Sequence, residues 1–169
     1  MIILGIDPGT ATTGYGVVES NQGKLKAIDY GCILTDKKLE MPERLDFLGE
    51  ELKKIIKKYQ PQALAVEELF FFKNTKTIIT VGQARGVILF VGKNSGRKTG
   101  LDIYEYTPLQ VKQAVVGYGR AEKKQVQQMV KAIFGLNEIP KPDDAADALA
   151  VAICCESSIK FEKRIGNRE

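Results

Sequence analysis

The first ten residues constrain the fold most, because a short apolar run there ends abruptly in a carboxylate. The run from Ile2 to Ile6 is rich in aliphatic, β-branched residues and predicts a buried strand. Asp7 closes this run, although aspartate is depleted in strands and costly to bury without a partner. Pro8 and Gly9 then end the strand and permit close approach of backbone or of a ligand. Asp7 therefore either opens a turn, as Asp-Pro-Gly commonly does, or belongs to a functional site.

The hydrophobic pattern of the rest of the chain predicts four more strands and five helices. The strands are expected at 14–19, 25–34, 63–66 and 101–106, with a tight turn at 21–23 joining the first two of them. The helices are expected at 42–59, 75–91, 108–116 and 120–134, with a last one beginning at 142. This order predicts an α/β protein with a five-stranded mixed sheet, whose first three strands are antiparallel and whose two faces are covered by helices.

Length and composition predict one domain. A chain of 169 residues can bury a sufficient core, and we expect that domain at 1–158, followed by a disordered tail at 159–169 that has little apolar content. Three cysteines without metal-ligand spacing favour a reducing, cytoplasmic location. We expect no signal peptide and no membrane span, because the apolar runs are too short or interrupted by polar residues.

Charge and residue types narrow the possible chemistry. The sequence contains no histidine, which excludes Ser-His and Cys-His nucleophilic catalysis and zinc sites that need imidazole. Nine Lys or Arg residues lie between Gly86 and Pro142 against only four Asp or Glu. This excess indicates either a polyanionic partner such as nucleic acid or an ordinary solvated basic face.

Two further carboxylates lie on the last predicted helix. Asp144 and Asp147 are three residues apart and therefore share a helix face. Asp143 and Asp144 have an ordinary explanation, since acids in a first turn interact favourably with the helix dipole. Asp147 lies one turn further in, among alanines and aliphatic residues, where an unpaired charge is unfavourable. Asp147 is therefore a candidate site residue.

Asp7 and Glu67 each end a predicted strand, and they lie at the same edge of the sheet if those strands are parallel neighbours. With Asp144 and Asp147 they would form a cluster whose mutual repulsion requires protons or a cation. Oxygen ligands favour Mg²⁺ or Mn²⁺, and Mg²⁺ commonly binds substrate phosphates as well. Because side chains alternate along a strand, only one of Glu67 and Glu68 can face such an ion, and the sequence does not decide which.

Several motifs together resemble a known family, the crossover (Holliday) junction endodeoxyribonuclease RuvC family of the RNase H-like superfamily. The resemblance spans most of the chain and rests on Gly5–Thr10, Glu67–Phe70, Gly82–Gly86, Val111–Gln113, Ala121–Lys123 and Asp144–Ala150. It implies a homodimer that binds a four-way DNA junction and cuts it by paired symmetric nicks. A junction-migration helicase complex is a further expected partner.

The resemblance also implies roles for single residues. Asp7, Glu67, Asp144 and Asp147 would hold two Mg²⁺ ions, with Mn²⁺ able to substitute, for hydrolysis to 5′-phosphate and 3′-hydroxyl ends. Lys112 and Lys123 match basic residues that engage the DNA near the cut, although a solvated helix face would explain them too. Phe70 matches an aromatic residue that stacks on an unpaired base.

Three other functions compete with this interpretation. The first stretch also resembles the phosphate loop of actin-like ATPases, but those proteins have two lobes and about twice this length. A non-catalytic DNA-binding protein with a helix-turn-helix at 111–130 would leave the carboxylates unexplained. An RNA-directed RNase H-like homologue is disfavoured by the Asp-Ala-Ala-Asp sequence of the last helix.

Overall fold

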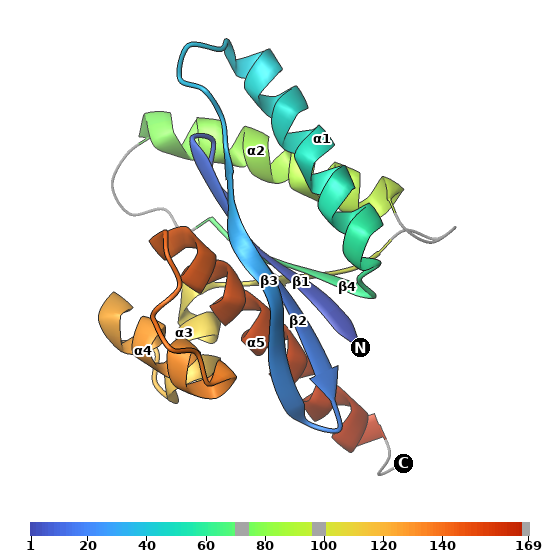
Figure 1. Cartoon of the computed structure of the whole chain (residues 1–169), viewed down its shortest axis with the longest axis vertical. Coiled ribbons are helices and arrows are strands. Elements are labelled where there is room, and N and C mark those ends of the chain that lie inside the picture. The colour runs from blue at the N-terminus through green and yellow to red at the C-terminus, as the bar shows by residue number, and fades with distance from the viewer. Residues whose placement is uncertain (70–74, 96–100, 167–169) are drawn as a thin grey trace.

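The computed structural model describes residues 1–69, 75–95 and 101–166, and in it five strands form one mixed sheet. The strands are β1 (Ile2–Asp7), β2 (Thr12–Asn21), β3 (Lys24–Leu34), β4 (Ala63–Glu67) and β5 (Asp102–Tyr106). The helices are α1 (Met41–Tyr59), α2 (Thr75–Asn94), α3 (Pro108–Val116), α4 (Lys123–Phe134) and α5 (Asp143–Gly166). Figure 1 shows this arrangement, which confirms the predicted fold class.

The strand order is β3-β2-β1-β4-β5, with β1, β2 and β3 antiparallel and with β4 parallel to both β1 and β5. The parallel pairing matters for the site, because it brings the carboxyl ends of β1 and β4 to the same edge of the sheet. Both carboxylate-terminated strands therefore end side by side, which meets the condition that the sequence analysis left open.

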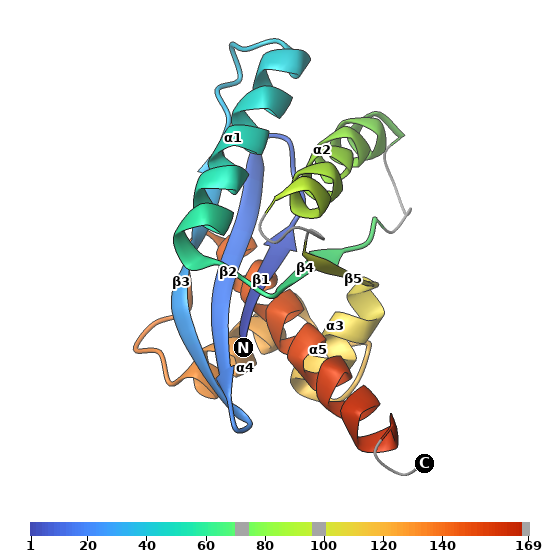
Figure 2. The ribbon, with the colours of Figure 1, turned by 90° about the vertical axis from the view of Figure 1, so that its right-hand side faces the viewer.

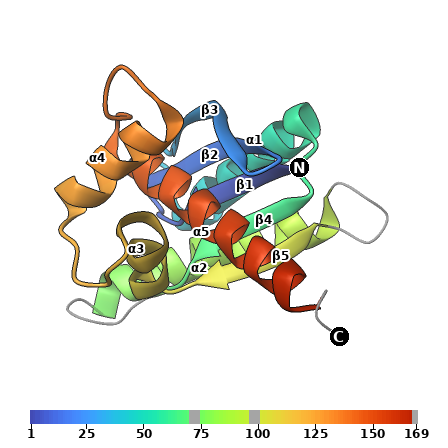
Figure 3. The ribbon, with the colours of Figure 1, turned by 90° about the horizontal axis from the view of Figure 1, so that it is seen from below.

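Helices cover both faces of this sheet. Figure 2 shows α1 and α2 on one face, and Figure 3 shows α3 and α4 beside α5 on the other. Each face has its own core, because alternate residues of a strand point to opposite sides. Ile3 and Val18 pack with α5, whereas their neighbours Leu4 and Val17 pack with α1 and α2. None of the helices in the described part of the chain is long and apolar enough to cross a membrane.

Local sequence signals set where the helices begin. Thr107 caps α3 by accepting a hydrogen bond from the backbone N–H of Gln110, and the Gln110 side chain accepts one from the backbone N–H of Thr107. Glu122 and Gln125 form the same reciprocal arrangement at α4. The sequence pattern predicted that this helix begins at Arg120, but α4 begins at Lys123. The second capping box explains the difference. It also places Lys123 in the first turn of α4.

The end of the chain differs from expectation. The composition predicted a disordered tail at 159–169, but α5 continues as a helix to Gly166, and residues 167–169 lie outside the described residues. Ile159 is buried in the core, and Lys160 forms an ion pair of 2.5 Å with the buried Glu156. The Nζ of Lys160 also donates a hydrogen bond to the carbonyl oxygen of Gly23 in the β2–β3 turn. These contacts extend the helix beyond the point at which composition alone would end it.

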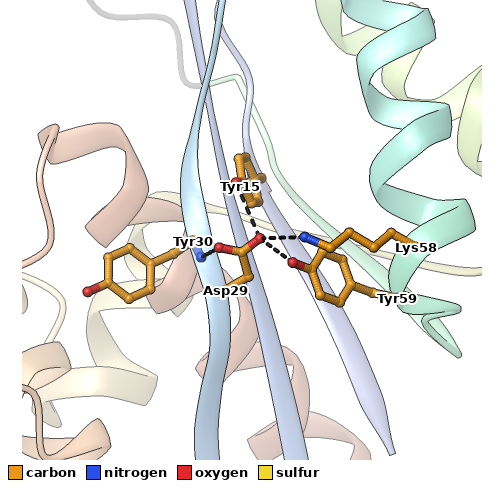
Figure 4. Close-up of polar contacts among 5 residues, drawn as sticks. All are labelled: Tyr15, Asp29, Tyr30, Lys58 and Tyr59. Carbon is orange, nitrogen blue, oxygen red and sulfur yellow. Dashed lines mark hydrogen bonds and ion pairs between the residues drawn. The ribbon is translucent and has the colours of Figure 1, made fainter.

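A polar cluster that the sequence did not reveal joins α1 to β3. Asp29 lies at a β-bulge and faces α1, where its carboxylate accepts a hydrogen bond from the hydroxyl of Tyr59 (Figure 4). The backbone N–H of Tyr30 donates a hydrogen bond of 2.9 Å to Oδ1 of Asp29, and the Lys58 ammonium lies 3.8 Å from Oδ2. Burial and the nearby Asp29 raise the pKa of Tyr15, whose hydroxyl also points at this carboxylate. The cluster holds the C-terminal end of α1 against the sheet.

Candidate active site

Glycines in the sheet position the helix that carries two of the candidate carboxylates. A Cβ atom on Gly5 would lie 2.2 Å from the carbonyl oxygen of Ala148, and one on Gly14 would lie 2.0 Å from that of Asp144. Real Cβ atoms do not approach oxygen so closely, so the α5 backbone rests directly on β1 and β2 at these points. The glycines thereby bring the first turns of α5 beside the end of β1.

Strand alternation selects which strand-end carboxylates face α5. Ile3 and Ala65 both pack in the core beneath α5. Asp7 lies four positions after Ile3 and Glu67 two positions after Ala65, so both side chains point to this same face. Glu68 lies one position further on and is out of this alternation, and its backbone N–H donates to the carbonyl oxygen of Tyr106. The structure therefore places Glu67, and not Glu68, toward α5.

Asp7 interacts electrostatically with each of the other three candidate carboxylates. Burial raises the pKa of Asp7 well above its usual value, and the neighbouring Glu67, Asp147 and Asp144 raise it further. Burial, followed by repulsion from Asp147, raises the pKa of Glu67 to about 7. Burial also raises the pKa of Asp147, against the opposing effect of a hydrogen bond from Lys123. Asp7, Glu67 and Asp147 are harder to ionise chiefly because they are buried and further because a neighbouring carboxylate repels each of them, which is the condition that a bound cation relieves.

Two lysines stand at the edge of the cluster. The ammonium of Lys123 lies 2.9 Å from Oδ2 of Asp147 and 3.5 Å from Oδ2 of Asp143. Burial acts to lower the pKa of Lys123, but its hydrogen bond to Asp147 raises the pKa above the usual value. Lys112 on α3 and Lys123 both act to lower the pKa of Glu67. Lys112 and Lys123 are therefore within electrostatic reach of the carboxylates.

A cavity of about 230 Å³ opens between these groups. Strand β4 and helices α3, α4 and α5 supply its wall, which consists of Glu67, Pro108, Val111, Lys112, Lys123, Val126, Asp147 and Ala150. Its volume is below the usual range for pockets that enclose whole small ligands. A cavity of this size with mixed charges suits a single phosphate group of a longer substrate rather than a complete cofactor.

The carboxylate cluster does not form a ready-made metal site among the described residues. In the part of the chain that the structure describes, no three Asp, Glu or Cys side chains are already arranged to hold a metal ion. The charges of Glu67, Asp144 and Asp147 nevertheless all act on Asp7, so the four carboxylates are within electrostatic reach of one another around Asp7. The Lys123 ammonium holds one of them, Asp147, in its own hydrogen bond.

Most of the site residues expected from the sequence are thus together in space. The structure gathers Asp7, Glu67, Asp144 and Asp147 with Lys112 and Lys123 at one edge of the sheet. Phe70, expected to stack on a base, lies outside the described residues. Sequence reasoning missed the second partner of Lys123, Asp143, and also missed the glycines beneath α5. The alternating Gly14 and Gly16, set against an alanine-rich helix, were the signal that could have revealed the close approach.

Known proteins resemble this chain over nearly its whole length. The family model described as crossover junction endodeoxyribonuclease RuvC matches residues 3–155. A curated protein of that name from Desulfitobacterium hafniense is 57% identical over 166 residues, which cover 98% of each chain. The Thermus thermophilus RuvC structure is 34% identical with a TM-score of 0.83, covering 98% of this chain and 97% of the other. The structure of T. thermophilus RuvC in complex with a Holliday junction substrate is 31% identical with a TM-score of 0.84, covering 95% and 96%.

Proposed function

Because this chain belongs to the RuvC family of crossover junction endodeoxyribonucleases, we propose that it resolves Holliday junctions by paired symmetric nicks during DNA recombination and repair. The observation that carries this proposal is a small cavity lined by two carboxylates, Glu67 and Asp147, and two lysines, with Asp7 and Asp144 in electrostatic reach of one another beside it. The relative bound to a Holliday junction substrate supports the choice of substrate.

The carboxylate cluster fits divalent cations. Asp7, Glu67, Asp144 and Asp147 offer only oxygen atoms, the donors that Mg²⁺ and Mn²⁺ prefer over zinc or copper. The raised pKa values of Asp7, Glu67 and Asp147 favour the same assignment, since a cation would stabilise the ionised forms. When bound, a pair of such ions supplies activation of water and stabilisation of charge on the leaving oxygen, for hydrolysis to 5′-phosphate and 3′-hydroxyl ends.

The residues of the chain itself bind and orient the DNA backbone. Lys112 and Lys123 stand in the wall of the cavity and attract a phosphate to the carboxylates, which would otherwise repel it. Pro108, Val111 and Val126 form an apolar side of the same wall, which limits water around the phosphate. Phe70, in the sequence motif 67–70, remains a proposed base-stacking residue.

We also infer a homodimer, which two symmetric nicks require. Helix α2 exposes Ile79 (62%), Gln83, Gly86 and Phe90 (67%) along one side. These positions are separated by four, three and four residues, the spacing with which helices pack against each other in coiled coils. Nothing lies within 4 Å of a Cβ added at Gly86, so this side of α2 is open for a second copy of the chain. The helicase complex expected as a further partner stays a prediction.

A cleavage assay tests the proposed function. The purified protein is incubated with a labelled four-way junction or with a linear duplex of the same sequence, each with Mg²⁺ or with EDTA. We expect paired nicks only in the junction and only with Mg²⁺, with products that a ligase can seal because they carry 5′-phosphate and 3′-hydroxyl ends. Equal cutting of the linear duplex, or cutting in EDTA, would contradict the proposal.

A further inference from the structure

The ammonium of Lys123 is shared between two carboxylates with different surroundings. Asp147 is the nearer partner at 2.9 Å, and its side chain is 26% exposed. Asp143 is the second partner at 3.5 Å, and its side chain is 61% exposed. Lys123 lies in the first turn of α4, and its side chain is 53% exposed, which leaves the ammonium room to move. The same ammonium can therefore be held by an inner or by an outer carboxylate.

Asp147, the inner carboxylate, also belongs to the proposed cation site. Asp147 lines the catalytic cavity and repels Asp7 and Glu67, so it belongs to the cluster proposed to hold divalent cations. The Lys123 ammonium occupies Oδ2 of Asp147 and so competes with a cation for that oxygen, although Oδ1 keeps its own lone pairs. Two positive charges at one carboxylate also repel each other. Cation binding by Asp147 therefore weakens its ion pair with Lys123 and favours a move of the ammonium to another partner.

We propose that Asp143 is a positioning residue that receives the Lys123 ammonium when a divalent cation binds Asp147. This inference rests on the proposed function, because it takes Asp147 as a cation ligand. Lys123 then acts as a tethered counter-ion, which neutralises Asp147 before the cation binds and is displaced by it. Asp143 lowers the cost of this exchange by giving the displaced ammonium a second partner at the mouth of the cavity.

Ordinary helix-dipole stabilisation by Asp143 does not account for this geometry. An acid in the first turn of α5 needs no partner on another helix, whereas Asp143 shares the Lys123 ammonium with Asp147 across the gap between α4 and α5. The exchange model also predicts that the effect of Asp143 on cation binding is transmitted through Lys123. A through-space effect of its charge would act whether or not Lys123 is present.

Calorimetric titration of the metal-free full-length protein with Mn²⁺, without DNA, measures this coupling directly. The proteins compared are wild type, Lys123→Met, Asp143→Asn and the double variant, in about 0.15 M salt to screen distant charges. Lys124→Met is the matched control, because Lys124 follows Lys123 on the same helix and lines a different cavity. Asp143→Glu serves as the conservative variant. Circular dichroism confirms that each variant is folded.

The exchange model predicts effects of opposite sign. Lys123→Met removes the competitor and tightens Mn²⁺ binding by about tenfold, whereas Lys124→Met changes it by less than about twofold. Asp143→Asn weakens binding by about threefold in the presence of Lys123, an effect of the size measured for exposed ion pairs. The same substitution leaves the affinity of the Lys123→Met protein unchanged. Asp143→Glu restores the wild-type affinity.

Three possible results of the Mn²⁺ titrations would contradict this inference, and one of them would also contradict the proposed cation site. If Asp143→Asn weakens Mn²⁺ binding by the same factor with and without Lys123, Asp143 does not act through Lys123 and the inference is wrong. Unchanged Mn²⁺ affinity in Lys123→Met also overturns it, while the proposed cation site stands. A wild-type protein that does not bind Mn²⁺ at all overturns both the cation site and this inference.

Discussion

Replacing Glu67 with glutamine is expected to stabilise the metal-free protein while abolishing its activity. The pKa of Glu67 is about 7 in the folded protein, against an ordinary value of 4.5. The folded state therefore holds more protons than the unfolded state between these two pH values, so stability falls as the pH rises from about 4.5 to about 7. At about 1.4 kcal/mol for each pH unit, ionised Glu67 costs the folded protein about 3 kcal/mol above pH 7. Glutamine has nearly the same shape and cannot ionise, so it removes this cost.

Urea unfolding in EDTA at pH 8 and at pH 4.5 measures the effect. We expect Glu67→Gln to raise the free energy of unfolding by about 3 kcal/mol at pH 8, which corresponds to roughly 6 to 12 °C in melting temperature, and to change it little at pH 4.5. Glu68→Gln is the matched control and should have no such pH-dependent effect. If Glu67→Gln destabilises the protein at pH 8, burial and repulsion do not govern this carboxylate and our description of the cluster is wrong.

Three other substitutions test separate parts of the structure. In Gly14→Ala the new Cβ would lie 2.0 Å from a backbone oxygen of Asp144, so the free energy of unfolding should fall by at least about 3 kcal/mol and Mn²⁺ binding should weaken. Wild-type values in urea unfolding and in calorimetric titration would show that α5 does not rest on this glycine. Asp29→Asn should cost about 1 to 3 kcal/mol in urea unfolding, because the hydroxyl of Tyr59 and the ammonium of Lys58 lose their charged partner. Phe90→Glu should give a monomer in sedimentation that still binds Mn²⁺, and a variant that sediments as a wild-type dimer would place the interface elsewhere.

Much of the fold was predictable from local patterns. The apolar runs, the tight turn after β2 and the capping signals at Thr107 predicted the elements, because each depends on residues near one another in the sequence. The sequence placed Asp7 and Glu67 at the ends of two short buried strands, but the parallel pairing of β1 with β4 that brings them together comes from the structure. Alternation along β4 then decides between Glu67 and Glu68, but only once the core face of that strand is known.

The features that the sequence did not reveal depend on contacts between distant segments. The sharing of Lys123 between Asp143 and Asp147 needs the packing of α4 beside α5, which no local pattern specifies. The extension of α5 beyond 158 depends on the contacts of Ile159 and Lys160 with the core and with the β2–β3 turn. Composition alone treats such a segment as polar and unsupported, because it does not include the surface on which the segment packs.

The central claim is that the carboxylates gathered around Asp7 hold the cations that cut the junction, and Asp7→Asn tests it most directly. Asn cannot supply the charge that Asp7 brings to the cluster, while the lysines that attract the DNA backbone remain. We therefore expect gel-shift affinity for a four-way junction to match that of the wild type and Mg²⁺-dependent nicking of the same junction to be lost. A folded Asp7→Asn protein that nicks the junction at the wild-type rate would contradict the account.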